Sequence, residues 1–116
     1  LDCGNKNSTV FTNGRILSYM HNDHENMIHE SVQMDGSVII QPSYIGKNVK
    51  LNRSVVGPFA SIGDGCTVQN SVVSNCIVQT NTKLVNAVID NAMIGNSVEY
   101  HGEAKDLSIG DYTTVL

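Results

Sequence analysis

The 116-residue sequence contains no tryptophan and only two phenylalanines and four tyrosines. A chain of this length has room for about one domain, and a core with so few rings has to be built from valine, isoleucine and leucine. No apolar run approaches the roughly 20 residues of a membrane-spanning helix. We therefore expect a soluble protein without a membrane partner.

Clusters of lysine and arginine are also missing from the sequence. Seven basic residues are outnumbered by eleven acidic ones, and the net charge is -4 with a pI near 5.4. Proteins that bind nucleic acid or anionic membranes carry a basic patch or stripe. This composition excludes both as main partners.

The cysteines do not form a recognisable framework. Cys3, Cys66 and Cys76 are odd in number and include no Cys-x-x-Cys pair, which argues against paired disulfides and against a zinc knuckle. We expect a reducing, cytoplasmic location. Cys66 and Cys76 occupy small-residue positions of the repeat described next, so we expect buried structural thiols.

The chain contains an internal repeat. The dipeptide Ile-Gly occurs at Ile45, Ile62, Ile94 and Ile109, and Val78 fills the gap, so the steps 45 to 62, 62 to 78 and 78 to 94 are 17, 16 and 16 residues. Such a period is too long for a helix, whose apolar positions recur every three or four residues, and for a simple strand, where they alternate. A fixed period of this kind indicates a repeat architecture.

Each repeat unit divides into three sides of five or six residues. Two further aliphatic positions recur inside the units, at Leu51 and Val56, Val68 and Val73, and Leu84 and Ile89. Small or β-branched residues recur at two more positions, first at Val49, Cys66, Thr82, Val98 and Thr113, and second at Ser54, Ser71 and Ala87. Small side chains at fixed positions of every unit indicate that the three sides enclose a narrow prism, into which these side chains have to fit.

The pattern predicts an all-β fold in which a single chain winds into triangular parallel coils, stacked about 4.8 Å apart. Glycine, asparagine and aspartate between the sides tolerate turns and positive φ; we expect corners at Gly46, Asn52, Gly57, Gly63, Asn86, Asp90, Asn91 and Gly95. The repeat resembles the hexapeptide repeat of left-handed parallel β-helices. The left-handed sense is implied by this resemblance alone.

The ends of the chain are less regular. Val32 and Val38 are expected to point inward in a first coil with a turn at Pro42, and residues 99–106 are expected to form a loop. Upstream, Ser8 is a possible N-cap of a short helix with Val10, Phe11, Leu17 and Met20 on one face, although Gly14 costs that helix about 1 kcal/mol relative to alanine. We place this helix and a polar linker in residues 1–26 and the β-helix in residues 27–116.

The first residues carry a family resemblance. The stretch LDCGNKNSTVFTNGRIL resembles the end of the catalytic domain of sugar-phosphate nucleotidyltransferases, in which an Asp-x-Gly segment follows a strand and leads into a helix. In that family a β-helix follows, and the phrases SVVGPFASIGDGCTV and LSIGDYTTV resemble that region. Within the family, the chain is most similar to the glucose-1-phosphate thymidylyltransferase and mannose-1-phosphate guanylyltransferase group.

The resemblance implies a longer enzyme, consistent with a chain that opens on Leu1 without an initiator methionine. That enzyme would join a nucleoside triphosphate to a sugar 1-phosphate and release pyrophosphate, with Mg²⁺ neutralising the phosphates. Asp2 matches the family's metal-binding aspartate. The remaining catalytic groups would precede Leu1, so we expect this chain to be inactive alone and to act as an assembly and regulatory module, a homo-oligomer and specifically a trimer by family habit.

The positions of the histidines bear on two alternative functions, an acyltransferase and a carbonic anhydrase. Hexapeptide-repeat acyltransferases, which use acetyl-CoA, place a histidine general base at the cleft between neighbouring subunits and often carry a loop extruded from a coil. His101 is expected to lie in such a loop. A γ-class carbonic anhydrase needs three zinc-binding histidines across coils, but only His101 lies in the coil region. His21, His24 and His29 precede the coils, and we expect them to be solvated rather than to bind metal.

Overall fold

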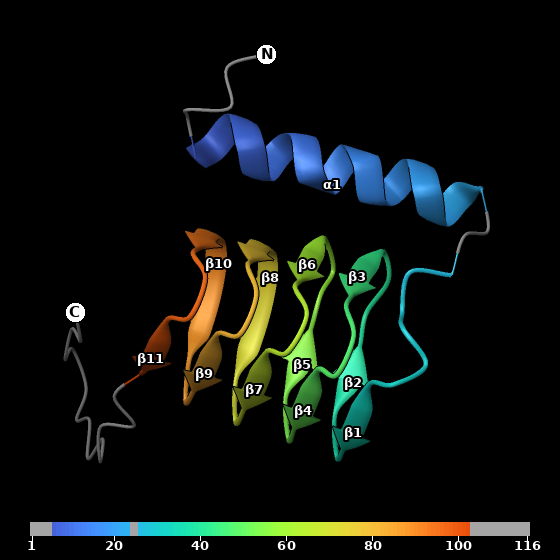
Figure 1. Cartoon of the computed structure of the whole chain (residues 1–116). Coiled ribbons are helices and arrows are strands. Elements are labelled where there is room, and N and C mark those ends of the chain that lie inside the picture. Colours follow the sequence, from blue (N-terminus) through green and yellow to red (C-terminus); the bar gives the residue numbers. More distant parts are fainter. Residues whose placement is uncertain (1–5, 24–25, 103–116) are drawn as a thin grey trace, which may run out of the picture.

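The computed structural model describes residues 6–23 and 26–102. These residues form a parallel β-solenoid with one α-helix lying along its length (Figure 1). The expected all-β class, parallel coils and short N-terminal helix are confirmed, and the left-handed sense stays a prediction of the resemblance.

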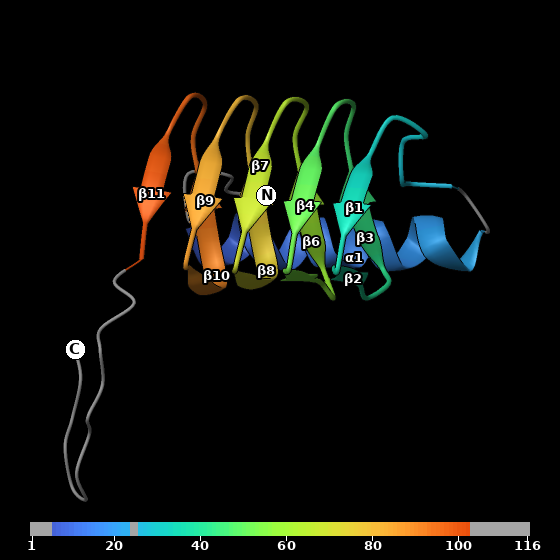
Figure 2. The ribbon, with the colours of Figure 1, turned by 90° about the horizontal axis from the view of Figure 1, so that it is seen from below.

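Every strand pairing of the solenoid is parallel. One sheet has the order β1-β4-β7-β9-β11, with bounds Gln33–Asp35, Lys50–Asn52, Thr67–Gln69, Lys83–Val85 and Glu99–His101 (Figure 2). The other two sides of the prism are formed by β2 (Val38–Ile39), β3 (Ser43–Ile45), β5 (Val55–Val56), β6 (Ala60–Ile62), β8 (Val72–Val78) and β10 (Val88–Ile94). The long strand β8 runs through both of these sides, because its residues pair with β5 and with β6. Strand β10 does the same, because it pairs with both halves of β8.

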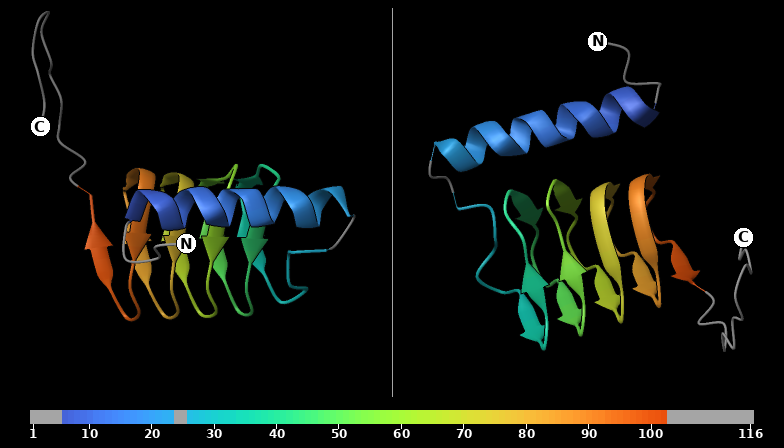
Figure 3. Two further views of the ribbon diagram at one scale, coloured as in Figure 1. Left: turned by 90° about the horizontal axis from the view of Figure 1, so that it is seen from above. Right: turned by 180° about the vertical axis from the view of Figure 1, so that it is seen from behind.

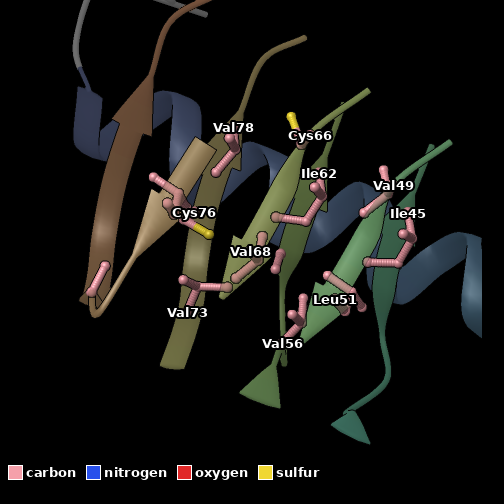
Figure 4. Packing of buried hydrophobic residues seen from close by; sticks show 13 residues of the cluster. Ile45, Val49, Leu51, Val56, Ile62, Cys66, Val68, Val73, Cys76 and Val78 are labelled. Carbon is pink, nitrogen blue, oxygen red and sulfur yellow. The ribbon is translucent and has the colours of Figure 1, made fainter. Parts of the chain in front are cut away.

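Three columns of side chains fill the prism, one from each side. Strand register stacks Ile28, Ile45, Ile62, Val78 and Ile94 in the first column, Met34, Leu51, Val68, Leu84 and Tyr100 in the second, and Ile39, Val56, Val73 and Ile89 in the third. Figure 4 shows members of these columns pointing into the same interior. The period read from the sequence is therefore one turn of the prism.

Burial follows the position of each coil in the stack. Ile62, Val68, Val73, Val78 and Leu84 are at most 1% exposed. The repeat predicts the same burial for Ile89 and Ile94, but both are only partly buried; among the described residues, their strand β10 pairs with β8 alone.

The described small positions of the repeat are buried except for Val98, which is half-buried, and two of them form a hydrogen-bonded ladder. The Ser54 hydroxyl donates to the carbonyl of Asn52 and accepts from the amide of Ser71 at 3.2 Å. The Ser71 hydroxyl repeats this arrangement and accepts from the amide of Ala87 at 3.0 Å. Serine thus satisfies backbone amides inside the prism at positions where they would otherwise be buried without a partner.

The N-terminal part corrects three expectations. In the first coil it is Ile39 that stacks on Val56, whereas Val38 points outward and is 55% exposed. Helix α1 spans Lys6–Asn22, so Ser8 lies inside its first turn and is not the N-cap. Phe11, expected on the buried helical face, is 66% exposed.

The expected loop at residues 99–106 is also wrong where it can be compared. Glu99–His101 form strand β11, which pairs with β9, and the residues from 103 onward lie outside the described part, as does Thr113. The corners were placed correctly at Gly57, Asn86 and Asn91, which have positive φ. At other expected corners, a residue next to the expected one has the positive φ, as Arg53 does beside Asn52.

One corner explains why the period shortens from 17 to 16 residues. Between the third and first columns, the chain passes through Gly57, Pro58 and Phe59 in one coil but only through Ser74 and Asn75 in the next, as the pairings of Val56 with Val73 and of Ala60 with Cys76 show. The longer corner separates β5 from β6. The shorter corner lets β8 continue through the turn.

Helix α1 lies across the strands and along the axis of the solenoid, over β10, β8, β6 and β3 (Figures 1 and 3). Its buried side chains are Val10 and Leu17, and its Asn13 carboxamide oxygen accepts a hydrogen bond of 2.8 Å from the Ser61 hydroxyl. A helix of this length is about 25 Å long, which matches the height of several stacked coils. Within the described residues, no helix has the length and apolarity needed to cross a membrane.

Truncating an interior column should destabilise the fold strongly. We expect Ile62→Ala to lower the free energy of unfolding by about 2 to 4 kcal/mol and Ile62→Asp to prevent folding, because an unpaired carboxylate would be buried between two coils. Urea denaturation followed by circular dichroism measures both. Ile16→Ala is the control, since Ile16 is 53% exposed on α1; equal losses for the two alanine variants would contradict the stacked core.

Candidate functional site

One face of the solenoid carries an exposed stripe of valines. Strand register places Val38, Val55, Val72 and Val88 in a row on the outside of β2, β5, β8 and β10. Val38, Val72 and Val88 are 55%, 47% and 86% exposed, and Val55 is half-buried. We call these four residues the valine stripe.

The other two faces differ from the valine stripe. The face formed by β3, β6 and the second halves of β8 and β10 lies under helix α1. The face of β1, β4, β7, β9 and β11 presents polar side chains in register, among them Lys50, Thr67, Lys83 and Glu99. Aligned apolar side chains that are exposed on a small domain indicate an association surface.

His101 stands at the end of β11, where its neighbour in the sheet is Val85. Its Nε2 lies 2.9 Å from Oε1 of Glu99, and both side chains are more than half exposed. The hydrogen bond from His101, the charge of the imidazole and the charge of Lys83 lower the pKa of the Glu99 carboxyl. His101 is therefore an accessible imidazole on an open strand, with one ring nitrogen held by a carboxylate.

The other candidate ligands are not brought together. His21 is exposed near the end of α1, and the Nδ1 of His29 lies 2.8 Å from the hydroxyl of Ser31. Asp2 and His24 lie outside the described residues. In residues 6–23 and 26–102, no three histidine, cysteine, aspartate or glutamate side chains are grouped to hold a metal ion, so this part offers no donor set for Mg²⁺.

Cys66 and Cys76 are both free and fully buried. Burial raises the pKa of the Cys76 thiol to about 12, and the negative charge of Asp90 acts in the same direction. Burial likewise raises the pKa of the Cys66 thiol, whose Sγ lies 2.8 Å from the carbonyl of Gln79. Both are structural thiols, as the repeat predicted.

The raised pKa values predict that neither thiol reacts in the folded protein. At pH 8 both thiols stay protonated, and the thiolate is the nucleophile. Iodoacetamide should leave Cys66 and Cys76 unmodified in peptide mass spectra, and unfolding in urea should make both react. Alkylation of either residue at the same rate with and without urea would contradict its burial.

A pocket that was not expected from the sequence lies between α1 and the solenoid. It has a volume of about 530 Å³, and its lining includes Phe11, Gly14 and Arg15 from the helix and Phe59 and Asn75 from the corners. Two local anomalies were visible in the sequence: a glycine inside a helix, and a phenylalanine at a corner where the next two coils have Asn75 and Asn91. Only the fold shows that these two residues face each other.

Comparison with known proteins places similarity over about three quarters of the chain. The bifunctional protein GlmU of Synechococcus elongatus is 32% identical over 103 residues, covering 76% of this chain and 22% of that protein. The glucose-1-phosphate thymidylyltransferases of Streptomyces griseus and Streptomyces antibioticus are 27% and 25% identical, covering 75% and 77% of this chain and 26% and 27% of their own lengths. No family model matches the sequence. The chain thus spans about a quarter of the length of these relatives.

Proposed function

We propose that this chain is the C-terminal β-solenoid module of a sugar-1-phosphate nucleotidyltransferase. The observation that carries the proposal is the similarity over three quarters of the chain to proteins that include two glucose-1-phosphate thymidylyltransferases. The solenoid behind an N-terminal helix is the arrangement that the family resemblance implied. The module's own work is assembly and regulation of the enzyme.

Assembly is proposed to use the valine stripe. Its valines follow the repeat of the coils, about 4.8 Å apart, so a second solenoid has a surface of the same spacing. Three copies around an axis parallel to the solenoid would bring three stripes together, in the closed symmetry that soluble oligomers favour. We therefore propose a homotrimer.

A charge in the stripe should break the oligomer. Light scattering on the purified chain should give a multiple of 12.5 kDa, three by this proposal, and Val72→Lys should reduce it to the monomer mass because the lysine would be desolvated among valines. Gln69→Lys on the neighbouring polar face is the matched control and should leave the mass unchanged. An unchanged mass for Val72→Lys would show that another surface forms the interface.

The whole enzyme is proposed to transfer a nucleotidyl group from a nucleoside triphosphate to a sugar 1-phosphate. Mg²⁺ would neutralise the phosphates, and Asp2 would supply one of its carboxylate ligands. The free, buried cysteines support a reducing, cytoplasmic location. Acetyl transfer with His101 as general base is the other activity that the repeat allows, and the exposed His101–Glu99 pair is the feature to test for it.

One set of assays separates these two activities. This chain alone should neither release pyrophosphate nor transfer an acetyl group from acetyl-CoA. In the longer protein, Asp2→Asn should lower Mg²⁺-dependent nucleotide-sugar formation by orders of magnitude through loss of a metal ligand. His101→Ala should leave that rate nearly unchanged. Acetyl transfer that disappears with His101→Ala would overturn the assignment in favour of an acyltransferase.

A further inference from the structure

The pocket between helix α1 and the solenoid has the size of a small-molecule site. Its volume of about 530 Å³ lies within the range of about 300 to 1,000 Å³ in which proteins bind small ligands. One wall is the helix, and the other is a row of corners from successive coils. Each wall contains a residue that local structure alone does not favour.

On the solenoid wall that residue is Phe59. Strand register stacks Phe59, Asn75 and Asn91 at the same corner, and all three have left-handed backbones with φ of 62°, 46° and 57°. Asparagine tolerates this conformation, whereas for a bulky residue such as phenylalanine it is strained. The coil with Phe59 therefore accepts strain in order to place an aromatic ring in the pocket.

On the helix wall that residue is Gly14. It lies in the middle of α1, where glycine is less stable than alanine. A Cβ added to Gly14 would come no closer than 3.5 Å to the Phe59 ring, which is an ordinary van der Waals contact. Since neither the backbone nor the packing requires glycine, its effect is to leave space beside Phe59.

The side chains around this space combine aromatic, cationic and amide chemistry. Both phenylalanines of the chain line the pocket, and the ring of Phe11 is 66% exposed. The Arg15 guanidinium lies 6.0 Å from the centroid of that ring. On the solenoid side, Asn75 donates a hydrogen bond of 2.8 Å from Nδ2 to Oδ1 of Asp90, so an amide and a carboxylate are fixed next to each other.

We propose that this pocket binds a nucleoside phosphate. The planar base stacks on the rings of Phe11 and Phe59, as bases do on aromatic side chains in nucleic-acid-binding proteins. Asn75 and Asp90 offer acceptors and donors to the edge of the base, and Arg15 binds the phosphate through a charge-assisted hydrogen bond. The proposal does not rest on the nucleotidyltransferase assignment, because the pocket lies within this chain and is tested by binding.

The experiment is isothermal titration calorimetry of the 116-residue chain with UMP, TMP, AMP and GMP, each compared with ribose 5-phosphate. We expect at least one nucleotide to bind and ribose 5-phosphate to bind at least about tenfold more weakly, because it lacks the base that stacks. Equal affinity for ribose 5-phosphate would reduce the pocket to an anion site and overturn the proposal. Absence of binding by all four nucleotides at millimolar concentration would overturn it as well.

Variants that keep the fold separate binding from stability. Phe11→Ala should weaken nucleotide binding about tenfold. Tyr19→Ala should not, because it removes an aromatic ring of the same helix that is 77% exposed and is not part of the pocket lining. Arg15→Gln should weaken binding, and Lys6→Gln, which removes one positive charge from α1 outside the pocket lining, should not. Equal effects within either pair would contradict the proposed contacts.

Gly14→Ala gives the sharpest result. The added methyl group should leave the melting temperature unchanged or raise it, because alanine favours the helix. The same methyl group fills space beside Phe59 and should therefore weaken nucleotide binding. Unchanged affinity in Gly14→Ala together with a folded protein would show that the nucleotide does not occupy this space.

Discussion

Each coil of the solenoid has to lie directly above the previous one, with identical positions in contact. Parallel pairing at about 4.8 Å brings a side chain such as Val68 between Leu51 and Leu84, so neither neighbour can be much larger or more polar without disturbing three coils. The interior therefore consists of aliphatic columns separated by small residues. Burial is lower at Ile89 and Ile94, whose strand β10 pairs with β8 alone among the described residues.

The same constraint controls the corners. A chain that closes a triangle every 16 or 17 residues needs left-handed residues at its turns, and among the described residues asparagine occupies six of the nine such positions that are not glycine, as at Asn70 and Asn86. Inside the corner the serine ladder of Ser54 and Ser71 satisfies amides that the sharp turn leaves unpaired. Regular stacking and tight turns are thus two consequences of one geometry.

In such a regular fold, we look for functional sites at positions where the sequence or the conformation is unusual. The valine stripe departs in polarity, because a position that could be polar is apolar in four successive coils. Phe59 departs in residue type, since it is a phenylalanine in a left-handed conformation that the next two coils fill with asparagine, and Gly14 departs from helix preference. Departures that cost local stability are characteristic of functional sites, and here two of them meet at one pocket between the helix and the coils.

Much of the fold was accessible from the sequence, since the columns depend on spacing along one chain. Ile45, Ile62, Val78 and Ile94 could be assigned to one column by counting alone. Counting was less reliable in the first coil, where Val38 and Ile39 are both apolar and a shift of one residue exchanges the inside for the outside. It also failed at Glu99–His101, because polar side chains hide a strand that the neighbouring β9 stabilises through its backbone.

The sequence by itself determined the period, the three sides of each coil and the residues that fill the prism, because these depend on local repeats of a single chain. Only the tertiary structure decided where helix α1 lies, since Val10 and Leu17 could pack on any apolar face. That placement covers one face, leaves the valine stripe exposed, and brings Gly14 against Phe59, which is 45 residues further along the chain. Contacts between segments so far apart in the chain do not follow the repeat. They depend on which surfaces of the helix and of the solenoid fit together once the coils have formed.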